Sequence, residues 1–461
     1  MSDPNTLSEA SLSQLRRQVS GQVLTPDDAD YGQAIAAWNL AAVHTPTVVV
    51  VAENASDVAA AVGAAAQVGL GIGIQATGHG SVLPIDGMLI ATGRMDSVSI
   101  DPVARTATVG AGAIAGPVLA AAQEHGLAPL IGSSITVGAV GLTLGGGVGW
   151  LSRKYGPACD AVRSFEVVTP DGAAVHASAT ENEELFRALR GGGGGVLGVV
   201  TAMQIDLFPV TTVYGGSLLY PASAAAEVAE HYARWVGQAP DDLTSSLVFM
   251  NFPPLPQVPD PLRGQSFTIV RGCWSGDMAD GRRFVDTFRN AMPPAMDVWA
   301  EMPFAASATI GNDPVDPMSV AGCSSWLTDL DGDVAAALAA NTFPSGGPPP
   351  VVFSEVRHLG GAMSRANDDS VMGNRDRQFL FQSSGLNPET RVAMTPAHVR
   401  LIEALGPYRS GRTSLNFLAG EERRSSTRSS TDPARQDSLA SLQARLDPDN
   451  LFRFGVTHLA D

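Results

Sequence analysis

Residues 75–80 read QATGHG and follow a short apolar run, 71–75, that is typical of a β-strand. Small residues at such a turn let backbone N–H groups approach the phosphates of a ligand closely. One imidazole, that of His79, lies among them. The segment therefore indicates a binding loop that presents His79 to its ligand. The alternative is a tight turn with an incidental histidine.

Two further stretches are rich in glycine. Residues 137–150 read VGAVGLTLGGGVGW, but Trp150 stands where a dinucleotide-binding fingerprint requires its third glycine, and Asp160 comes too early to be its acidic residue. We therefore reject a Rossmann site there. Residues 190–201 read RGGGGGVLGVVT, and such a run costs much backbone entropy on folding. A flexible linker is the alternative, but a linker rarely runs straight into a β-branched strand.

The composition indicates a globular protein of more than one domain. The 461 residues are 44% hydrophobic and 16% charged, which suits two or three packed domains. A net charge of −17 would repel polyanions, so nucleic acid and anionic membranes are poor partners. Cys159, Cys273 and Cys323 are widely spaced, which disfavours a disulfide framework or a metal site. Residues 1–20 lack the apolar core of a secretory signal, so we expect a cytoplasmic protein.

The order of predicted elements divides the chain near Pro209. Before it, short strands alternate with helices, among them a helix at 58–67 that we expect Ser56-Asp57 to cap. After it, longer strands alternate with helices, which is typical of an α+β domain with an antiparallel sheet. The expected strands are 47–52, 71–75, 87–91, 97–101, 106–110, 164–168, 173–178, 199–208, 216–220, 245–252, 266–271, 351–358 and 378–382. The other expected helices are 114–125, 182–189, 224–238, 279–291, 333–341 and about 430–446, the last following a short strand in the tail.

In this order, the segments resemble the FAD-linked oxidases of the vanillyl-alcohol oxidase/p-cresol methylhydroxylase (PCMH) superfamily, and more closely its berberine-bridge-enzyme-like branch. Supporting motifs are AWN at 37–39, MDSV at 95–98, RTATVGAG at 105–112, LSRKYG at 151–156, ELFRALRGG at 184–192, LGGA at 359–362 and DPDNLFR at 447–453. The resemblance spans nearly the whole chain and implies an α+β fold. Its parts are a two-part PCMH-type FAD-binding domain over 1–208 (core about 40–210), an α/β substrate-binding domain with an antiparallel sheet over 209–411, and a C-terminal segment, 412–461, that returns to the FAD-binding domain.

The resemblance also implies how FAD is held. In the family, the residue that matches His79 bonds covalently to the 8α-methyl group of the flavin, and many members add a second bond from a cysteine. Ser134 stands at the cysteine position, so we expect a single covalent link, through His79. Gln75 stands where many relatives carry arginine. The expected cofactor-binding residues are His79, Gln75, Ala76, Thr77, Gly78, Gly80, Ser134, Val137, Gly138, Gly141, Leu142, Gly145, Gly147, Gly198, Val200, Asn416 and Asn450.

Glu355 is the first candidate for catalysis. It lies on the largely apolar strand 351–358, where alternation places it on one face with Phe353 and Arg357. Burying a carboxylate there costs free energy, so Glu355 is expected either to have a function, such as that of a base, or to pair with a positive charge. The alternative is a pair with Arg357 at a sheet edge, and His358 is the rival base.

Two other positions complete the catalytic candidates. Gln382 ends a strand where relatives often place an active-site polar residue. Tyr155, in the RKYG motif, is either an active-site phenol or part of the core. Ser414 stands where several relatives carry a tyrosine whose phenol activates the substrate or acts as a base. This difference weakens the hypothesis of a simple alcohol oxidase.

The resemblance implies an oxidase. In the family, valine at a gate position accompanies reaction with O2, and Val137 occupies that position. We therefore expect hydride transfer from a small organic substrate (an alcohol, an amine or a natural-product intermediate) to the flavin and then to O2, in a monomer or homodimer. Two alternatives stay open: a flavin-N5-oxide-type oxygenase of secondary metabolism, and a non-catalytic flavoprotein that sequesters a ligand.

Overall fold

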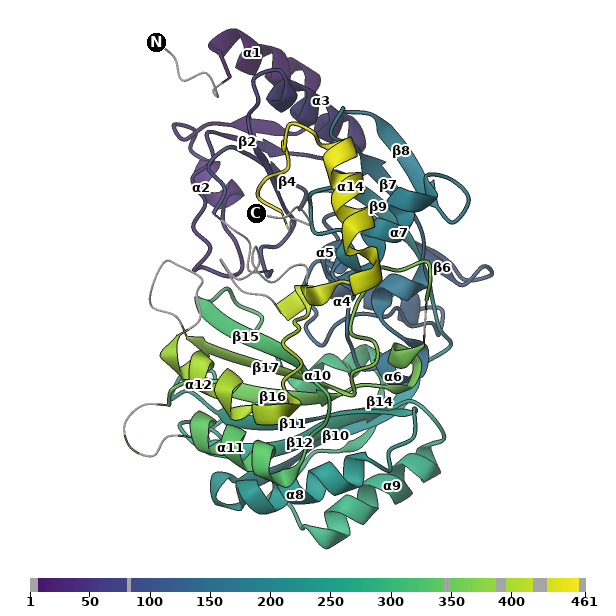
Figure 1. Cartoon of the computed structure of the whole chain (residues 1–461), viewed down its shortest axis with the longest axis vertical. Helices are drawn as coiled ribbons and strands as arrows, with labels where there is room; N and C mark the ends of the chain where they lie inside the picture. Colours follow the sequence, from purple (N-terminus) through teal and green to yellow (C-terminus); the bar gives the residue numbers. More distant parts are fainter. Residues whose placement is uncertain are drawn as a thin grey trace.

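The chain forms three β-sheets, two in one half of the molecule and one in the other (Figure 1). The computed structural model describes residues 7–80, 84–343, 346, 349–365, 367–386, 395–417 and 429–455. A four-stranded and a five-stranded sheet occupy the half that holds the N-terminus, and an eight-stranded sheet occupies the other half. The expected α+β class, with an antiparallel sheet in the second half, is confirmed.

The four-stranded sheet has the order β1-β2-β4-β3, in which β2, β4 and β3 are parallel and β1 is antiparallel to β2. All four valines of β2 are buried, as expected for a strand covered on both faces. The bounds are β1 (Gln22–Leu24), β2 (Val48–Val51), β3 (Ile72–Gln75) and β4 (Met88–Ala91). Helices of this half are α1 (Glu9–Gln18), α2 (Tyr31–Ala34) and α3 (Ala55–Ala66).

The predicted N-cap of α3, Ser56-Asp57, is wrong: the cap lies two residues earlier, at Asn54. The Asn54 side chain accepts from the backbone N–H of Asp57 at 3.0 Å and caps the helix. Asp57 is fully buried instead, and its carboxylate accepts from the N–H groups of Ser20 and Gly21 at 2.8 and 3.1 Å. The acid therefore ties the chain before β1 to the start of α3.

The five-stranded sheet is antiparallel throughout, with the order β5-β6-β9-β7-β8. The turn at residues 170–172, between the predicted strands 164–168 and 173–178, joins β7 to β8 as a hairpin, and the Thr169 N–H donates to the Ala173 carbonyl at 2.9 Å. The bounds are β5 (Val98–Asp101), β6 (Thr106–Gly110), β7 (Val162–Val168), β8 (Ala174–Ser178) and β9 (Val199–Asp206). Its neighbouring helices are α4 (Ala115–Gln123), α5 (Ala139–Leu144) and α7 (Glu183–Gly192), whereas the short α6 (Ser152–Tyr155) lies against β11 of the large sheet.

The eight-stranded sheet has the order β13-β10-β12-β11-β16-β17-β15, with β14 paired to β10. Its strands are β10 (Thr212–Pro221), β11 (Leu243–Asn251), β12 (Ser266–Trp274), β13 (Met296–Asp297), β14 (Ala300–Pro303), β15 (Val320–Leu327), β16 (Phe353–His358) and β17 (Phe379–Leu386). Strands β13, β14 and β15 were not predicted, because β13 and β14 are very short and β15 reads VAGCSSWL, which has little alternation. Glu355 therefore lies on β16, an inner strand between β11 and β17 and not a sheet edge.

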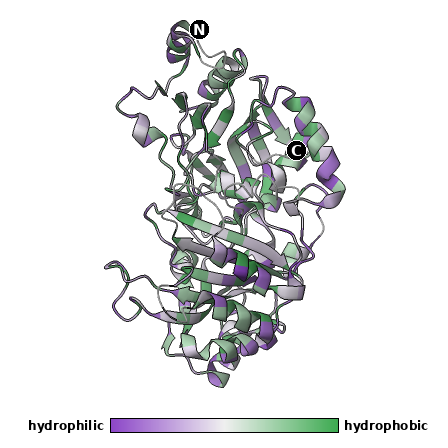
Figure 2. Cartoon of the chain, turned by 60° about the vertical axis from the view of Figure 1, so that its left-hand side comes forward, coloured by the Kyte–Doolittle hydropathy of each residue, from purple (hydrophilic) through white to green (hydrophobic). Residues whose placement is uncertain are grey.

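Helices cover one face of this sheet and leave the other face toward the first half of the chain. Helices α8 (Ala225–Val236), α9 (Met278–Ala291) and α11 (Gly332–Thr342) lie on the far side (Figure 1), and α12 (Pro396–Ala404) joins the same hydrophobic core. Figure 2 shows hydrophobic residues along many of the strands and hydrophilic residues along the outer helices. The short helix α10 (Ala308–Gly311) lies against β10 and β12.

The C-terminal segment packs against the first half of the chain. Helix α14 (Gln436–Leu446) places Leu439 and Leu442 in the core of the five-stranded sheet. The Ile72 N–H at the start of β3 donates to the Leu451 carbonyl at 2.7 Å. The strand expected early in the tail does not form in residues 412–417, of which 415–417 make a 3-10 turn, and residues 418–428 lie outside the described part.

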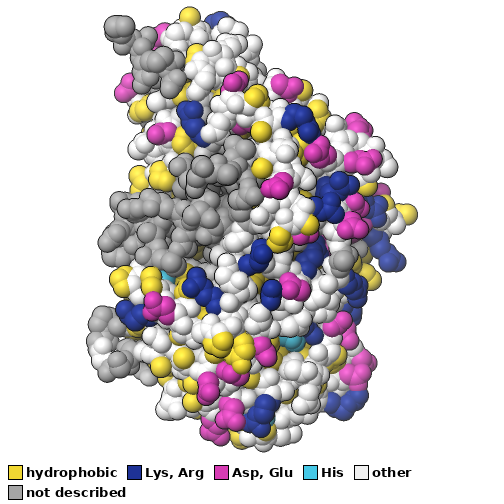
Figure 3. All heavy atoms as spheres, in the orientation of Figure 1, with side chains coloured by type: hydrophobic (Ala, Val, Ile, Leu, Met, Phe, Trp, Pro, Cys, Tyr) yellow, Lys and Arg dark blue, Asp and Glu magenta, His cyan; other side chains and the backbone are white. Residues whose placement is uncertain are grey.

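The described surface mixes both signs of charge. Figure 3 shows acidic and basic side chains interspersed over the visible face, although the chain as a whole carries a net charge of −17. All three cysteines are buried. Among the described helices, none is both long and apolar enough to span a bilayer.

Candidate active site

A cavity of about 810 Å³ lies between the loops of the first half and the uncovered face of the large sheet. The three glycine-rich stretches of the sequence all reach its wall. Residues of β16 and β17 close the opposite side. Its volume falls within the range of small-molecule and cofactor sites, roughly 300–1,000 Å³.

The loop 75–80 is braced by buried side chains at its start. Oε1 of Gln75 accepts from Nε2 of His44 at 3.0 Å, and Nε2 of Gln75 donates to the Ala36 carbonyl at 3.0 Å. Gly78 has a φ of +70°, and a Cβ there would lie 2.5 Å from Cβ of Ala37. Only glycine fits this position without strain.

The same loop offers free backbone donors to the cavity. The carbonyls of Thr77 and Gly78 accept from the N–H groups of Trp38 and Asn39 at 2.9 and 3.2 Å. Among the described residues, the N–H groups of Thr77 and Gly78 have no acceptor. Successive free N–H groups in a turn of this kind form a concave site for an anion such as a phosphate. The loop therefore fits the pyrophosphate of a dinucleotide.

The imidazole of His79 is held on two sides. Its Nε2 lies 2.9 Å from the Thr136 hydroxyl, and its ring stacks on Trp38 with 4.0 Å between centroids and an interplanar angle of 16°. Burial lowers the pKa of His79 to about 4, against the opposing effect of the Asp313 carboxylate. The ring is therefore neutral near pH 7 and keeps a lone pair for nucleophilic attack.

The second glycine stretch is locked by a residue from the C-terminal segment. Asn416 accepts from the Gly147 N–H and donates to the Leu142 carbonyl, both at 2.9 Å. A Cβ at Gly145 would lie 2.5 Å from Nδ2 of Asn416. The glycine therefore allows the segment at 415–417 to close onto the cavity wall.

A charged cluster lies at one end of the sheet face. Oε1 of Glu355 accepts from Nη2 of Arg271 at 2.8 Å, and Oε2 accepts from Nε of Arg357 at 3.0 Å and from Nε2 of Gln382. Arg271 also donates to the Ser246 hydroxyl at 3.3 Å and to the Gly311 carbonyl at 3.0 Å. Glu355 is fully buried.

The cluster keeps Glu355 ionised. Burial raises the pKa of Glu355, but the positive charges of Arg271 and Arg357 outweigh it and hold the pKa well below its usual range. A carboxylate with so low a pKa is a weak proton acceptor. The geometry thus favours Glu355 as the group that positions two guanidinium groups.

Most of the predicted cofactor-binding residues line the cavity. Those that do are Gln75, Ala76, Thr77, Gly78, His79, Gly80, Ser134, Val137, Gly138, Gly141, Leu142, Gly145, Gly198, Val200 and Asn416. Gly147 and Asn450 do not line it: Gly147 packs on Ala158, and Asn450 lies exposed in a left-handed turn after α14.

Of the catalytic candidates, only Gln382 lines the cavity. Glu355 lies beneath Arg357 and Gln382, which do reach the cavity. Tyr155 packs on Phe208, with 4.4 Å between ring centroids, and is not brought to the cavity. His358, the rival base, is buried and lies 3.1 Å from Nη1 of Arg153, and Ser414 is buried away from the cavity.

Several residues of the site were not predicted from the sequence. Trp38, Arg271 and Asp313 line the cavity, and Thr136 contacts His79. Arg271 carried a usable signal, because a lone arginine in the apolar strand 266–274 requires an acidic partner. Asp313 lies in a loop, and no periodicity points to it.

Comparisons with known proteins relate the chain to flavin-binding proteins. Residues 46–178 match the family model described as FAD binding domain. (R)-6-hydroxynicotine oxidase of Paenarthrobacter nicotinovorans is 32% identical over 214 residues, 46% of this chain and 46% of that protein. An uncharacterized FAD-linked oxidoreductase of Bacillus subtilis is 31% identical over 242 residues, 51% of this chain and 53% of that protein. The chain thus spans about half the length of these curated relatives.

The solved structures share the fold over nearly the whole chain. 6-Hydroxy-D-nicotine oxidase from Arthrobacter nicotinovorans matches with a TM-score of 0.81 and 24% identity, covering 95% of this chain and 98% of that one. BBE-like 1 of Physcomitrella patens matches with a TM-score of 0.82 and 21% identity, covering 98% and 100%. The segment 46–178 is therefore an FAD-binding domain, within a chain that has the fold of PCMH-type FAD-linked oxidases.

Proposed function

We propose that this protein is an FAD-dependent oxidase of the berberine-bridge-enzyme-like branch, with one FAD bonded covalently to His79. One observation carries the proposal: a single cavity runs from the free N–H groups of loop 75–80, past a neutral His79, to the charged end of the large sheet. On this basis we assign 1–208 and 412–461 to cofactor binding and 209–411 to substrate binding.

Different residues of the cavity serve cofactor binding, substrate contact and O2 access in this proposal. The loop 75–80 holds the pyrophosphate through backbone donors, and His79 anchors the ring system. When bound, FAD accepts hydride from a substrate carbon and passes the electrons to O2. Gln382 and Arg357 face the substrate, and Glu355 fixes both of them from below. Val137 lines the cavity where we expect O2 to reach the cofactor.

Anaerobic titration tests the proposed activity. The purified protein is mixed with a panel of alcohols, amines and phenols, and the flavin absorbance is followed before and after O2 is admitted. The proposal expects at least one compound to bleach the flavin, with one equivalent of H2O2 formed on reoxidation. Uptake of O2 into the product without H2O2 would identify an oxygenase instead. Tight ligand binding without bleaching by any compound would identify a non-catalytic binder.

A further inference from the structure

The cavity-facing side of the large sheet is divided into a polar end and an apolar end. Ser246 on β11 is paired in register with both Arg271 on β12 and Arg357 on β16, and Glu355 is paired with Gln382 on β17. Because side chains alternate along a strand, these five share one face. They form the polar end, which lies against the glycine-rich half.

Two arginines share one carboxylate at the polar end. Arg271 has Glu355 on one side, the Gly311 carbonyl on another, and a favourable electrostatic interaction with Asp313. Arg357 contacts Glu355 only through Nε. Within the described residues, Nη1 and Nη2 of Arg357 have no hydrogen-bond partner, and the Arg357 side chain is 11% exposed. The positive charge of Arg357 is therefore not fully compensated.

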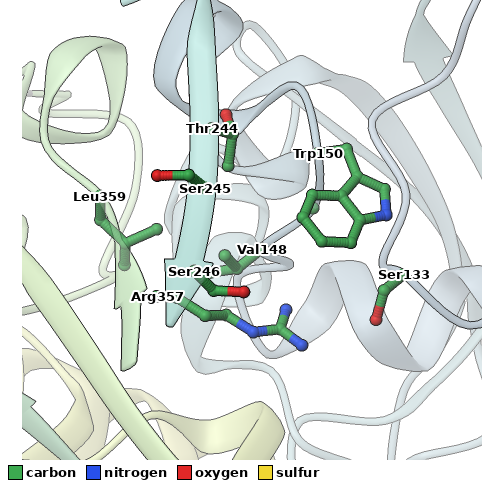
Figure 4. Close-up of a pocket in the computed structure, with 9 residues that line it drawn as sticks. Ser133, Val148, Trp150, Thr244, Ser245, Ser246, Arg357 and Leu359 are labelled. Atoms are coloured by element: carbon green, nitrogen blue, oxygen red, sulfur yellow. The ribbon is translucent and has the colours of Figure 1, made fainter. Parts of the chain in front are cut away.

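The side chain of Arg357 borders both a small pocket and the large cavity. Figure 4 shows the side chain extending beside Ser246 into the space bordered by Val148, Trp150 and Ser133. That pocket measures about 10 Å³, room for about one water molecule. Arg357 also lines the large cavity, where its Cζ lies 5.4 Å from the ring centroid of Phe417.

The other end of the same face is apolar. Met250 and Phe252, from β11 and the loop after it, and Phe353 on β16 line the cavity and belong to one hydrophobic cluster with Leu262. Leu255 and Val258, from the proline-rich loop, line the same end of the cavity. A bound molecule that spans this face therefore meets an apolar wall at one end and a partly uncompensated guanidinium at the other.

We propose that the substrate is an amphiphilic molecule with an apolar body and an anionic oxygen, a carboxylate or an ionised phenol or enol, that pairs with Arg357. This inference rests on the proposed function and names the substrate class of the same site. Guanidinium binds such an oxygen through charge-assisted hydrogen bonds, and a partly buried guanidinium gains most from a counterion. The apolar end takes the rest of the molecule.

Calorimetric titration of the FAD-loaded protein tests the proposal. The probes are naphthoate, naphthol and naphthalenemethanol, which share one apolar body and differ in the ionisation of their oxygen. We expect naphthoate, or naphthol at a pH where it is ionised, to bind at least about tenfold more tightly than naphthalenemethanol. Naphthoate and naphthol are the arms that distinguish a carboxylate substrate from a phenolic one.

Variants assign the selectivity to Arg357. Arg357→Gln should weaken the anionic probe about tenfold or more and change naphthalenemethanol little, and Arg357→Lys should retain part of the preference. Phe353→Ala should weaken all bound probes alike, and the exposed Arg94→Gln is the matched charge control. Equal binding of charged and neutral probes by the wild type, or equal loss of both in Arg357→Gln, would overturn the proposal. These binding measurements need no turnover, so they test the substrate class separately from the oxidase activity. The oxidase proposal is contradicted only when no compound bleaches the flavin.

Discussion

Nε2 of His79 lies 2.9 Å from the hydroxyl oxygen of Thr136, which lies 3.1 Å from the hydroxyl oxygen of Ser134. From the resemblance, we expect Ser134 to stand where many relatives carry a cysteine that forms a second covalent bond to the flavin. In the tautomer with its proton on Nε2, the imidazole donates to Thr136 and leaves the lone pair of Nδ1 free. Thr136 thus orients the imidazole, and in this tautomer Nδ1 is the nitrogen available for bonding.

Replacing Thr136 by valine should slow covalent attachment of FAD. The variant keeps the shape of the side chain but loses the hydrogen bond that orients the ring, which is worth about 1 kcal/mol or a several-fold change in rate. The measurement is the time course of acid-stable flavin after FAD is added to apoprotein. Thr136→Ser retains the hydroxyl and should behave like the wild type. Equal rates for the valine and serine variants would show that Thr136 has no positioning role.

The rate of attachment should depend on pH through His79. Burial lowers the pKa of His79 to about 4, so the neutral, nucleophilic ring persists at mildly acidic pH. Because protonation removes the lone pair, the rate should hold from pH 7 down to about 5 and decline through about pH 4. Short incubations at each pH, quenched with acid, measure this profile. A midpoint near 6.5, the value for an unperturbed histidine, would contradict the buried setting.

Gly78→Ala should abolish or strongly weaken FAD binding. The added Cβ would lie 2.5 Å from Cβ of Ala37, and the φ of +70° disfavours any side chain. Gly63→Ala is the matched control, since nothing lies within 4 Å of its Cβ in helix α3. The control should bind FAD normally and gain roughly 0.5–1 kcal/mol in free energy of unfolding. Flavin content and thermal unfolding of both variants check the pair.

Glu355→Gln should destabilise the fold strongly. It leaves Arg271 and Arg357 without their buried counterion, and breaking a buried ion pair costs about 3–5 kcal/mol. Glu53→Gln removes an exposed pair with Arg94 and should cost less than about 1 kcal/mol. Denaturant titration of both variants gives the two free energies. A loss in Glu355→Gln no larger than in Glu53→Gln would contradict the positioning role.

Local patterns predicted most of the fold. The predicted strands 47–52, 164–168 and 173–178 and the predicted helix 114–125 depend on neighbours in sequence, and each was placed within a few residues of β2, β7, β8 and α4. Strand β15 escaped because VAGCSSWL draws its stability from pairing with β17 along its whole length. The cap of α3 was misplaced because Asp57 is used by the distant Ser20 and Gly21.

The candidate site was predicted where its residues share a loop. The segment 75–80 carries its glycines and its histidine together, so the sequence alone indicates one wall of the cavity. The charged cluster was harder, because Arg271 and Glu355 are separated by 84 positions and meet only through the strand order β12-β11-β16. The i, i+2 spacing on one strand suggested only Arg357 as a partner of Glu355. In the folded sheet, Arg271 from β12 and Gln382 from β17 also contact Glu355.

Acid precipitation of the FAD-saturated wild-type protein and of the His79→Ala variant distinguishes covalently attached flavin from flavin that is only bound. The wild-type pellet should stay yellow after washing, with close to one FAD per chain. The His79→Ala pellet should be colourless, even if that variant binds FAD before acid is added. A colourless wild-type pellet, or equal retention of flavin by both proteins, would contradict covalent attachment through His79.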